Sequence, residues 1–237
     1  MDYIPKQPAQ LNFRNNCWPR MVEILDLLAS RGIACRYEIS GILAQKLNIS
    51  PRAGSLQNLY IDLVNADLIC ADTFPVCFHS KLAGIRLTEK GKKLCHDFGW
   101  QVVESEWERL ITHHSGSKQP RHTGAVLAFA HNARMRGWQV QVVPDTGVIN
   151  FFPDARVEKD GKAILVEVEL GVRKEPKWTL MGARQGYVAL CAKTPESRAS
   201  RIQECRSVGV GGMATDLHTL IKSRSETDSP LWVETWK

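Results

Sequence analysis

The chain has 237 residues, of which 43% are hydrophobic and 24% charged, and its formal net charge at pH 7 is +6. This composition excludes a disordered or collagen-like chain, and the length suits one large domain or two small ones. No apolar run approaches the roughly 18 residues of a membrane-spanning helix, and the first ten residues do not resemble a signal peptide. We therefore expect a cytoplasmic protein with no membrane partner, whose basic balance permits a nucleic-acid partner without requiring one.

The seven cysteines are odd in number, and no two of them have the spacing of a zinc finger. In a protein of the cytoplasm, such cysteines are expected to be reduced thiols of the core.

A polar segment with glycine and proline, residues 113–120, divides the sequence into two differently patterned halves. We expect a first domain over residues 15–112, a second over 120–222, and a polar tail over 223–237. Trp232 and Trp236 lie in this tail, and we expect both to dock on this chain or on a partner, because exposed tryptophan is costly.

Apolar spacing in the first half predicts helices over residues 18–30 and 37–47, and a third helix that ends near Asn65. Two β-leaning segments follow, over 68–74 and 78–87, and Thr88 then begins another helix. Helix, helix, helix, hairpin, helix is the order of a winged-helix domain. Ser55, Leu56 and Leu59 on the third helix, with the Leu87-Thr88-x-x-Gly91 phrase after the hairpin, resemble winged-helix DNA-binding domains.

This resemblance implies that the third helix enters the major groove of double-stranded DNA and that the hairpin contacts phosphate. The residues expected to contact DNA are Arg52, Ser55, Gln57 and Asn58 on the helix, and Lys81 and Arg86 on the hairpin. The alternative is a protein-interaction module, in which these polar and basic residues form a solvated face.

In the second half, residues 151–170 predict a β-hairpin whose two-residue turn is Asp160-Gly161. Residues whose numbers sum to 321 then face each other, so Asp154 stands opposite Glu167. Alternation assigns one face to the core. Its residues are Phe151, Pro153, Ala155, Val157, Ile164, Val166, Val168 and Leu170.

Asp154, Glu167 and Glu169 share the other face, where opposed carboxylates about 5 Å apart repel one another. A divalent cation, Mg²⁺ or Mn²⁺, would neutralise them, since Mg²⁺ favours one or two carboxylates with water and phosphate oxygens. The alternative is ion pairing with Arg156 or a nearby lysine on an exposed face of the sheet.

The Pro153-Asp154 pair, followed on the next strand by Glu167-Val168-Glu169, resembles the PD-(D/E)XK nuclease signature. The resemblance implies a restriction-endonuclease-like α/β/α domain with an αβββαβ core. The sequence supplies helices over 123–135, 177–184 and 196–206, and strands over 140–143, 149–158, 163–170 and 187–192. A last strand and short helix over 208–222 close the domain.

In such nucleases, Asp154 and Glu167 would be the metal ligands, and a lysine would stand at the position of Glu169. Glu169 is then a further ligand or a water-orienting base, and Lys174 or Lys177 is the candidate for the missing lysine. His122 lies on the apolar stripe of the preceding helix, so it is either a capping or core histidine or a member of the site. Arg198, Arg201 and Arg206 are interpreted as a solvated helix face, and the alternative is a strip that faces phosphate.

Together these patterns resemble the plasmid replication-relaxation family of mobile-element proteins over most of residues 15–220. The predicted fold is α/β (α+β), a winged-helix domain followed by a nuclease-like domain. The resemblance implies a DNA-binding protein with a Mg²⁺-dependent endonuclease or nickase domain. The alternative is a non-catalytic DNA-binding regulator of plasmid replication or transcription. Its degenerate nuclease-like domain would then mediate homodimerisation or dock a replication or transposition partner protein.

Overall fold

A computed structural model describes residues 4–77, 80–114, 119–148, 152–171, 177–223 and 229–237. These residues form a mixed α/β structure with two compact units. Residues 1–73 and 82–109 belong to the first unit, and residues 74–81 and 110–237 to the second. Among the described residues, no helix is both long enough and apolar enough to cross a membrane.

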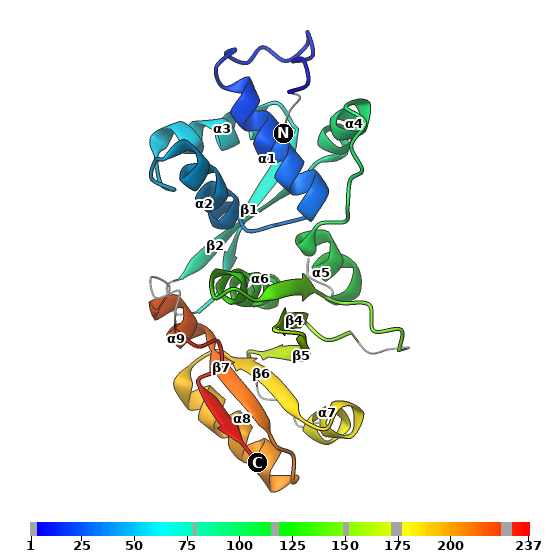
Figure 1. Cartoon of the computed structure of the whole chain (residues 1–237), viewed down its shortest axis with the longest axis vertical. Coiled ribbons are helices and arrows are strands. Elements are labelled where there is room, and N and C mark those ends of the chain that lie inside the picture. The colour runs from blue at the N-terminus through cyan, green and yellow to red at the C-terminus, as the bar shows by residue number, and fades with distance from the viewer. Residues whose placement is uncertain (1–3, 78–79, 115–118, 149–151, 172–176, 224–228) are drawn as a thin grey trace. The chain divides into compact units, whose positions relative to one another are not determined.

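The first unit contains three helices, a two-stranded sheet and a fourth helix (Figure 1). Their bounds are α1 (Trp18–Arg31), α2 (Arg36–Leu47), α3 (Gly54–Asn65), β1 (Ile69–Pro75), β2 (Lys81–Leu87) and α4 (Glu89–Asp97). One core unites the apolar faces of all four helices with Ile69 of β1 and Ile85 of β2. These elements lie within a few residues of the ranges predicted from apolar spacing.

The Leu87-Thr88-x-x-Gly91 phrase begins α4. The Thr88 side chain caps the helix by accepting a hydrogen bond from the Gly91 N–H at 3.0 Å. A Cβ atom at position 91 would lie 2.0 Å from the Leu68 carbonyl oxygen, so no larger residue fits there. The chain continues into α5 (Glu106–His114), which crosses the division between the units.

The tip of the β1–β2 hairpin belongs to the second unit. Phe74, Val76 and Cys77 are buried, and a Cβ atom on Gly124 would lie 2.6 Å from the Phe74 Cβ atom. Because Gly124 lies on helix α6 (Pro120–Met135), the tip packs directly on that helix. Nothing in the spacing of the hairpin residues predicted this contact.

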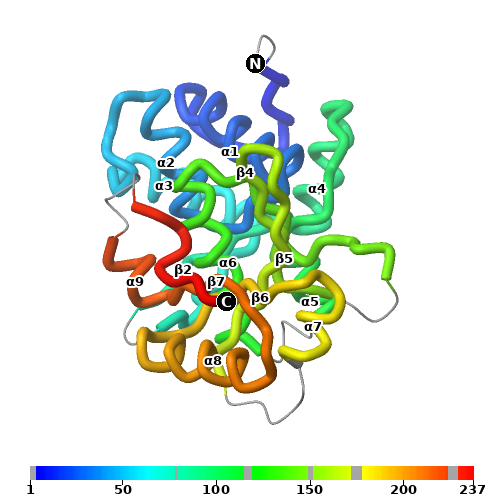
Figure 2. Tube along the Cα trace, turned by 60° about the horizontal axis from the view of Figure 1, so that its bottom comes forward, coloured from blue at the N-terminus to red at the C-terminus, as the bar shows by residue number. Residues whose placement is uncertain are grey.

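A six-stranded sheet in the order β3-β4-β5-β6-β7-β8 organises the second unit (Figures 1 and 2). Neighbouring strands are antiparallel except at β5–β6 and β6–β7, which are parallel. Helix α6 packs on β3, β4 and β5, whereas α7 and α8 pack near β6 and β7. The bounds are β3 (Gln139–Val142), β4 (Ala155–Lys159), β5 (Lys162–Glu169), α7 (Lys177–Gln185), β6 (Val188–Ala192), α8 (Pro195–Ser207), β7 (Gly212–Asp216), α9 (Leu217–Lys222) and β8 (Glu234–Trp236).

The β4–β5 hairpin has the predicted register. Ala155 pairs with Val166 and Val157 with Ile164, so the paired numbers sum to 321. The described residues of the predicted core face within these two strands are all buried, and Phe151 lies outside the described residues. Strand β4 begins at Ala155, later than expected, because Pro153 has no N–H for the ladder.

The C-terminal residues, predicted as a tail, complete the sheet. Strand β8 pairs antiparallel with β7, and the buried Trp236 donates a hydrogen bond to the Val210 carbonyl oxygen at 2.8 Å. The Trp232 ring lies 6.4 Å from the rings of Phe129 and Trp138. Both tryptophans therefore dock on this chain, which is one of the two outcomes expected from the sequence, the other being docking on a partner.

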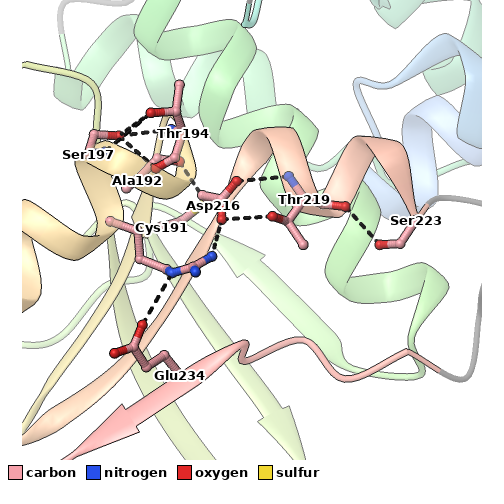
Figure 3. Close-up of polar contacts among 9 residues, drawn as sticks. Cys191, Ala192, Thr194, Ser197, Asp216, Thr219, Ser223 and Glu234 are labelled. Carbon is pink, nitrogen blue, oxygen red and sulfur yellow. Dashed lines mark hydrogen bonds and ion pairs between the residues drawn. The ribbon is translucent and has the colours of Figure 1, made fainter.

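Figure 3 shows the polar contacts that join α8, α9 and β8. Asp216 is fully buried, caps α9 by accepting from the Thr219 N–H at 2.8 Å, and pairs with Arg198 of α8. Arg198 also lies 3.6 Å from Glu234 of β8. Arg201 is buried as well, so the interpretation of these two arginines as a solvated face was wrong.

Candidate functional site

A cluster of ionisable side chains lies in the second unit, where three elements end or begin. Asp154 immediately precedes β4, His122 lies in the first turn of α6, and His114 is the last residue of α5. Pro120 is the first residue of α6, and Pro153 lies just before β4. Proline favours the start of a helix or strand, because it lacks a backbone N–H donor. The cluster therefore sits on backbone that regular elements hold in place.

Asp154 is the centre of this cluster and is only 1% exposed. Its Oδ1 atom lies 2.8 Å from His122 Nε2 and 3.2 Å from His114 Nδ1. Its Oδ2 atom accepts a hydrogen bond from the Val168 backbone N–H at 2.7 Å. The two imidazole rings are stacked, with centroids 5.8 Å apart and an interplanar angle of 15°.

Burial and the neighbouring groups set the protonation of this cluster. Burial alone would raise the pKa of Asp154, but the hydrogen bond and charge of His122, the charge of His114 and the Val168 N–H outweigh it, so the pKa is lowered. Burial is also the largest influence on His114 and lowers its pKa, against the opposing effects of Asp154 and the Phe152 backbone. An ionised Asp154 can only accept hydrogen bonds, so the His122 Nε2 atom is the donor.

The other two predicted carboxylates are buried but do not join this cluster. Glu167 and Glu169 are 8% and 7% exposed, and both take part in interactions of their own. Glu167 pairs with Leu190 of β6, which belongs to the apolar cluster beneath α7 and α8. Among the described residues, no group of three or more ligand side chains converging within 4.8 Å includes Glu167 or Glu169.

The side chains that converge on Asp154 differ from the ligand set expected for Mg²⁺. Mg²⁺ requires oxygen ligands in near-ideal octahedral geometry, and it is held by carboxylates and water. Both oxygens of Asp154 are already engaged by protein groups, and the atoms that converge with it are imidazole nitrogens. The neutralising group at Asp154 is thus a pair of histidines.

The predicted lysines lie at the edge of what the structure describes. Lys174 lies outside the described residues, and Lys177 is the first residue of α7. The assignment of a catalytic lysine therefore stays a prediction.

The predicted DNA-contacting residues of α3 lie at its N-terminal end. Arg52, Ser55 and Asn58 are exposed and Gln57 is half-buried. The sequence from Ile39 to Ile61 contains no Asp or Glu, so no carboxylate lies within the turn before α3 or in most of the helix. No side chain caps the N-terminus of α3, which leaves its first backbone N–H groups available.

The two predicted hairpin cations differ in their surroundings. Lys81 is exposed at the start of β2. Arg86 is half-buried, with its guanidinium 5.3 Å from the centre of the Trp107 ring and 3.7 Å from Glu108. Lys81 therefore remains the better placed of the two for a phosphate contact.

Sequence reasoning missed His114. It was assigned to the linker over 113–120, and no periodic pattern relates it to Asp154, forty residues later. The only signal was the adjacent pair His113-His114 at the end of a helix. His122, by contrast, was a candidate from its place in the first turn of α6, and its contact with Asp154 agrees with the site interpretation.

No known protein-family model matches the chain, and neither a curated protein nor a solved structure matches it. The function is therefore inferred from the two sites above, together with the resemblances seen in the sequence.

Proposed function

We propose that this chain is a DNA-binding protein of a mobile element, whose first unit is a winged-helix domain that binds double-stranded DNA. The observation that carries the proposal is the exposed, carboxylate-free surface formed by the turn before α3 and the N-terminal half of α3. The order of α1, α2, α3, the β1–β2 hairpin and α4 supports it.

The chemistry of this surface suits a phosphate backbone. An uncapped helix N-terminus presents backbone N–H groups and the positive end of the helix dipole, both of which favour an anion. Arg52 and Ser55 flank that terminus and can bind the same phosphates. Asn58 lies one turn further along the exposed face, where an amide side chain can pair with a base edge.

Substitution at this surface tests the proposal. Arg52→Ala should weaken binding of the full chain to duplex DNA by a similar factor for every DNA sequence, because one cationic phosphate contact is lost. Fluorescence anisotropy of a labelled duplex at fixed salt measures the change. Lys93→Ala is the matched control, because Lys93 is an exposed cation of α4 in the same unit and its loss changes the net charge equally.

Equal weakening by both variants would mean that only net charge matters, which would contradict a binding surface on α3. Duplex binding that neither variant changes would favour the protein-interaction alternative. Circular dichroism of each variant ensures that only folded protein is compared.

Hydrolysis of DNA phosphodiesters in the second unit is a second candidate function. The specific observation in its favour is the burial of three acids, Asp154, Glu167 and Glu169, at one end of the β4–β5 hairpin. Buried carboxylates are costly, and a fold that only needed a sheet would gain little from them. The order α6, β3, β4, β5, α7, β6 is also the order implied by the nuclease resemblance.

Conversion of supercoiled plasmid to the nicked form, with Mg²⁺ or Mn²⁺ added, tests this second function. Wild-type nicking that falls at least about a hundredfold in Glu167→Gln would support it, since loss of a catalytic group costs orders of magnitude in rate. Glu196→Gln is the control, because Glu196 is an exposed acid of the same unit, in the first turn of α8. If the wild type does not nick plasmid, the second unit is the degenerate domain of the alternative prediction, used for dimerisation or partner docking.

A further inference from the structure

We propose that His114, His122 and Asp154 form a binding site for one transition metal ion of the zinc class. The proposal concerns the second unit alone and holds whether or not the chain binds or cuts DNA. It differs from the Mg²⁺ site expected at Asp154 and Glu167 in both its ligands and its metal.

The separations among the three side chains suit a shared ion. Tetrahedral zinc, with bonds of about 2.0–2.1 Å to nitrogen and oxygen, places its ligand atoms roughly 3.3 Å apart. His122 Nε2 and His114 Nδ1 lie 2.8 and 3.2 Å from the same oxygen of Asp154, and one ligand atom from each of the three residues lies within 4.8 Å of the others. Both distances to Asp154 Oδ1 are therefore within about half an ångström of the separation that a shared ion requires.

The surroundings orient these ligands as an outer shell orients them in metal sites. The Val168 N–H holds the second oxygen of Asp154 at 2.7 Å, which fixes the carboxylate and leaves Oδ1 directed at the histidines. The two imidazole rings are stacked at an angle of 15°, and each directs one nitrogen at Asp154 Oδ1. The end of α5, the first turn of α6 and the residue before β4 thus present a preformed set of metal ligands.

The donor set selects the class of metal. Imidazole nitrogen suits Zn²⁺, Co²⁺ and Ni²⁺, whereas Mg²⁺ and Ca²⁺ prefer oxygen alone. Two imidazole nitrogens and one carboxylate oxygen are one of the ligand sets of open zinc sites, in which water or a substrate oxygen takes the fourth position.

Spectroscopy and calorimetry of the metal-stripped full chain test the proposal. Titration with Co²⁺ should produce the visible absorption of a low-coordinate cobalt site at one ion per chain, without a thiolate charge-transfer band. Isothermal titration should show Zn²⁺ binding that a large excess of Mg²⁺ does not displace. Zn²⁺ should also raise the midpoint of thermal unfolding, because an ion that binds only the folded state stabilises it.

Variants assign the ligands. His114→Gln and His122→Gln should each weaken Zn²⁺ binding by more than about a hundredfold, since loss of an outer-shell partner alone costs 10- to 100-fold. His96→Gln is the matched control, because His96 is an exposed histidine of α4 in the other unit, and Zn²⁺ affinity should not change.

Three results would overturn the proposal. They are the absence of a cobalt spectrum in the wild type, a thiolate charge-transfer band that assigns the ion to cysteines, and Zn²⁺ affinity that the His114 and His122 variants retain. The wild-type cobalt spectrum decides the question even if a histidine variant fails to fold. None of these readouts depends on DNA, so failure of this proposal is separable from failure of the proposed function.

Discussion

Glu108 of α5 makes polar contacts with Ser105 and with Lys92 of α4 in the first unit. Its carboxylate accepts hydrogen bonds from the Ser105 backbone N–H at 2.9 Å and from the Ser105 hydroxyl at 2.8 Å. Lys92 of α4 lies 2.8 Å away. Burial would raise the pKa of Glu108, but Lys92 and Ser105 outweigh it, so the pKa of Glu108 is lowered and that of Lys92 is raised.

The sign of these shifts predicts how stability depends on pH. A carboxyl whose pKa is lowered by folding contributes stability above its unfolded pKa, 4.5 for Glu108, and loses that contribution as the pH falls through the folded pKa. Glu108→Gln should therefore reduce the free energy of unfolding at pH 7 by about 1.5–3 kcal/mol, the net contribution of a hydrogen bond to a charged group. The difference from the wild type should shrink below pH 4.5.

Urea unfolding at a series of pH values measures this difference. Glu104→Gln is the control, because Glu104 is 43% exposed and lies 3.8 Å from Arg109, so its loss should matter little. A Glu108→Gln difference that stays constant from pH 7 to pH 4 would contradict the ionised Glu108 described above.

At Asp154 the sequence predicted the residue and the candidate His122, but not the second neighbour His114. Its place opposite Glu167 followed from alternation and from the Asp160-Gly161 turn, and the structure places it just before β4 rather than within the predicted strand. The approach of His114 depends on how α5 ends relative to the sheet of the second unit, which is a tertiary contact with no periodic trace in the sequence. The same reason explains why Arg198 was assigned to a solvated face, since its partner Asp216 lies on another element.

Among the elements of the second unit, α8, α9 and β8 depend on one buried ion pair. Removing one partner of such a pair leaves a buried charge and typically costs 3–5 kcal/mol. Arg198→Ala should therefore reduce the free energy of unfolding by about that amount, because the fully buried Asp216 loses its cationic partner. Arg206→Ala, an exposed residue of the same helix, should have little effect.

Chemical denaturation of both variants, followed by circular dichroism, measures the two changes. An Arg198→Ala variant no less stable than Arg206→Ala would show that Asp216 needs no cation, and that its capping of α9 suffices.

Elements were more predictable than their assembly, for a physical reason. Apolar spacing, the Thr88 cap and the Asp160-Gly161 turn are local signals, and they specify helices, strands and one hairpin register. The association of the hairpin tip with α6 rests on the close approach of Gly124 to Phe74, which are fifty residues apart. Strand β8 is only three residues long, and its pairing with β7 and the burial of Trp236 stabilise it. Three residues are too few for an alternating pattern that would predict a strand from the sequence.

At the scale of the whole molecule, the two units have separate chemistry. The first unit offers an exposed, carboxylate-free surface around the start of α3. The second unit offers a cluster of two half-buried histidines around the buried Asp154. We expect DNA affinity to reside in the first and metal affinity in the second, so that substitutions in one leave the other property intact.

The salt dependence of duplex binding by the full chain tests the proposed function most directly. Each phosphate that the protein neutralises contributes about −0.9 to the slope of log affinity against log salt. We predict a linear fall in log affinity, with a slope that Arg52→Ala reduces by about one and that the control Lys93→Ala leaves unchanged. Affinity that does not depend on salt, or a slope that Arg52→Ala leaves unchanged, would contradict DNA binding through α3.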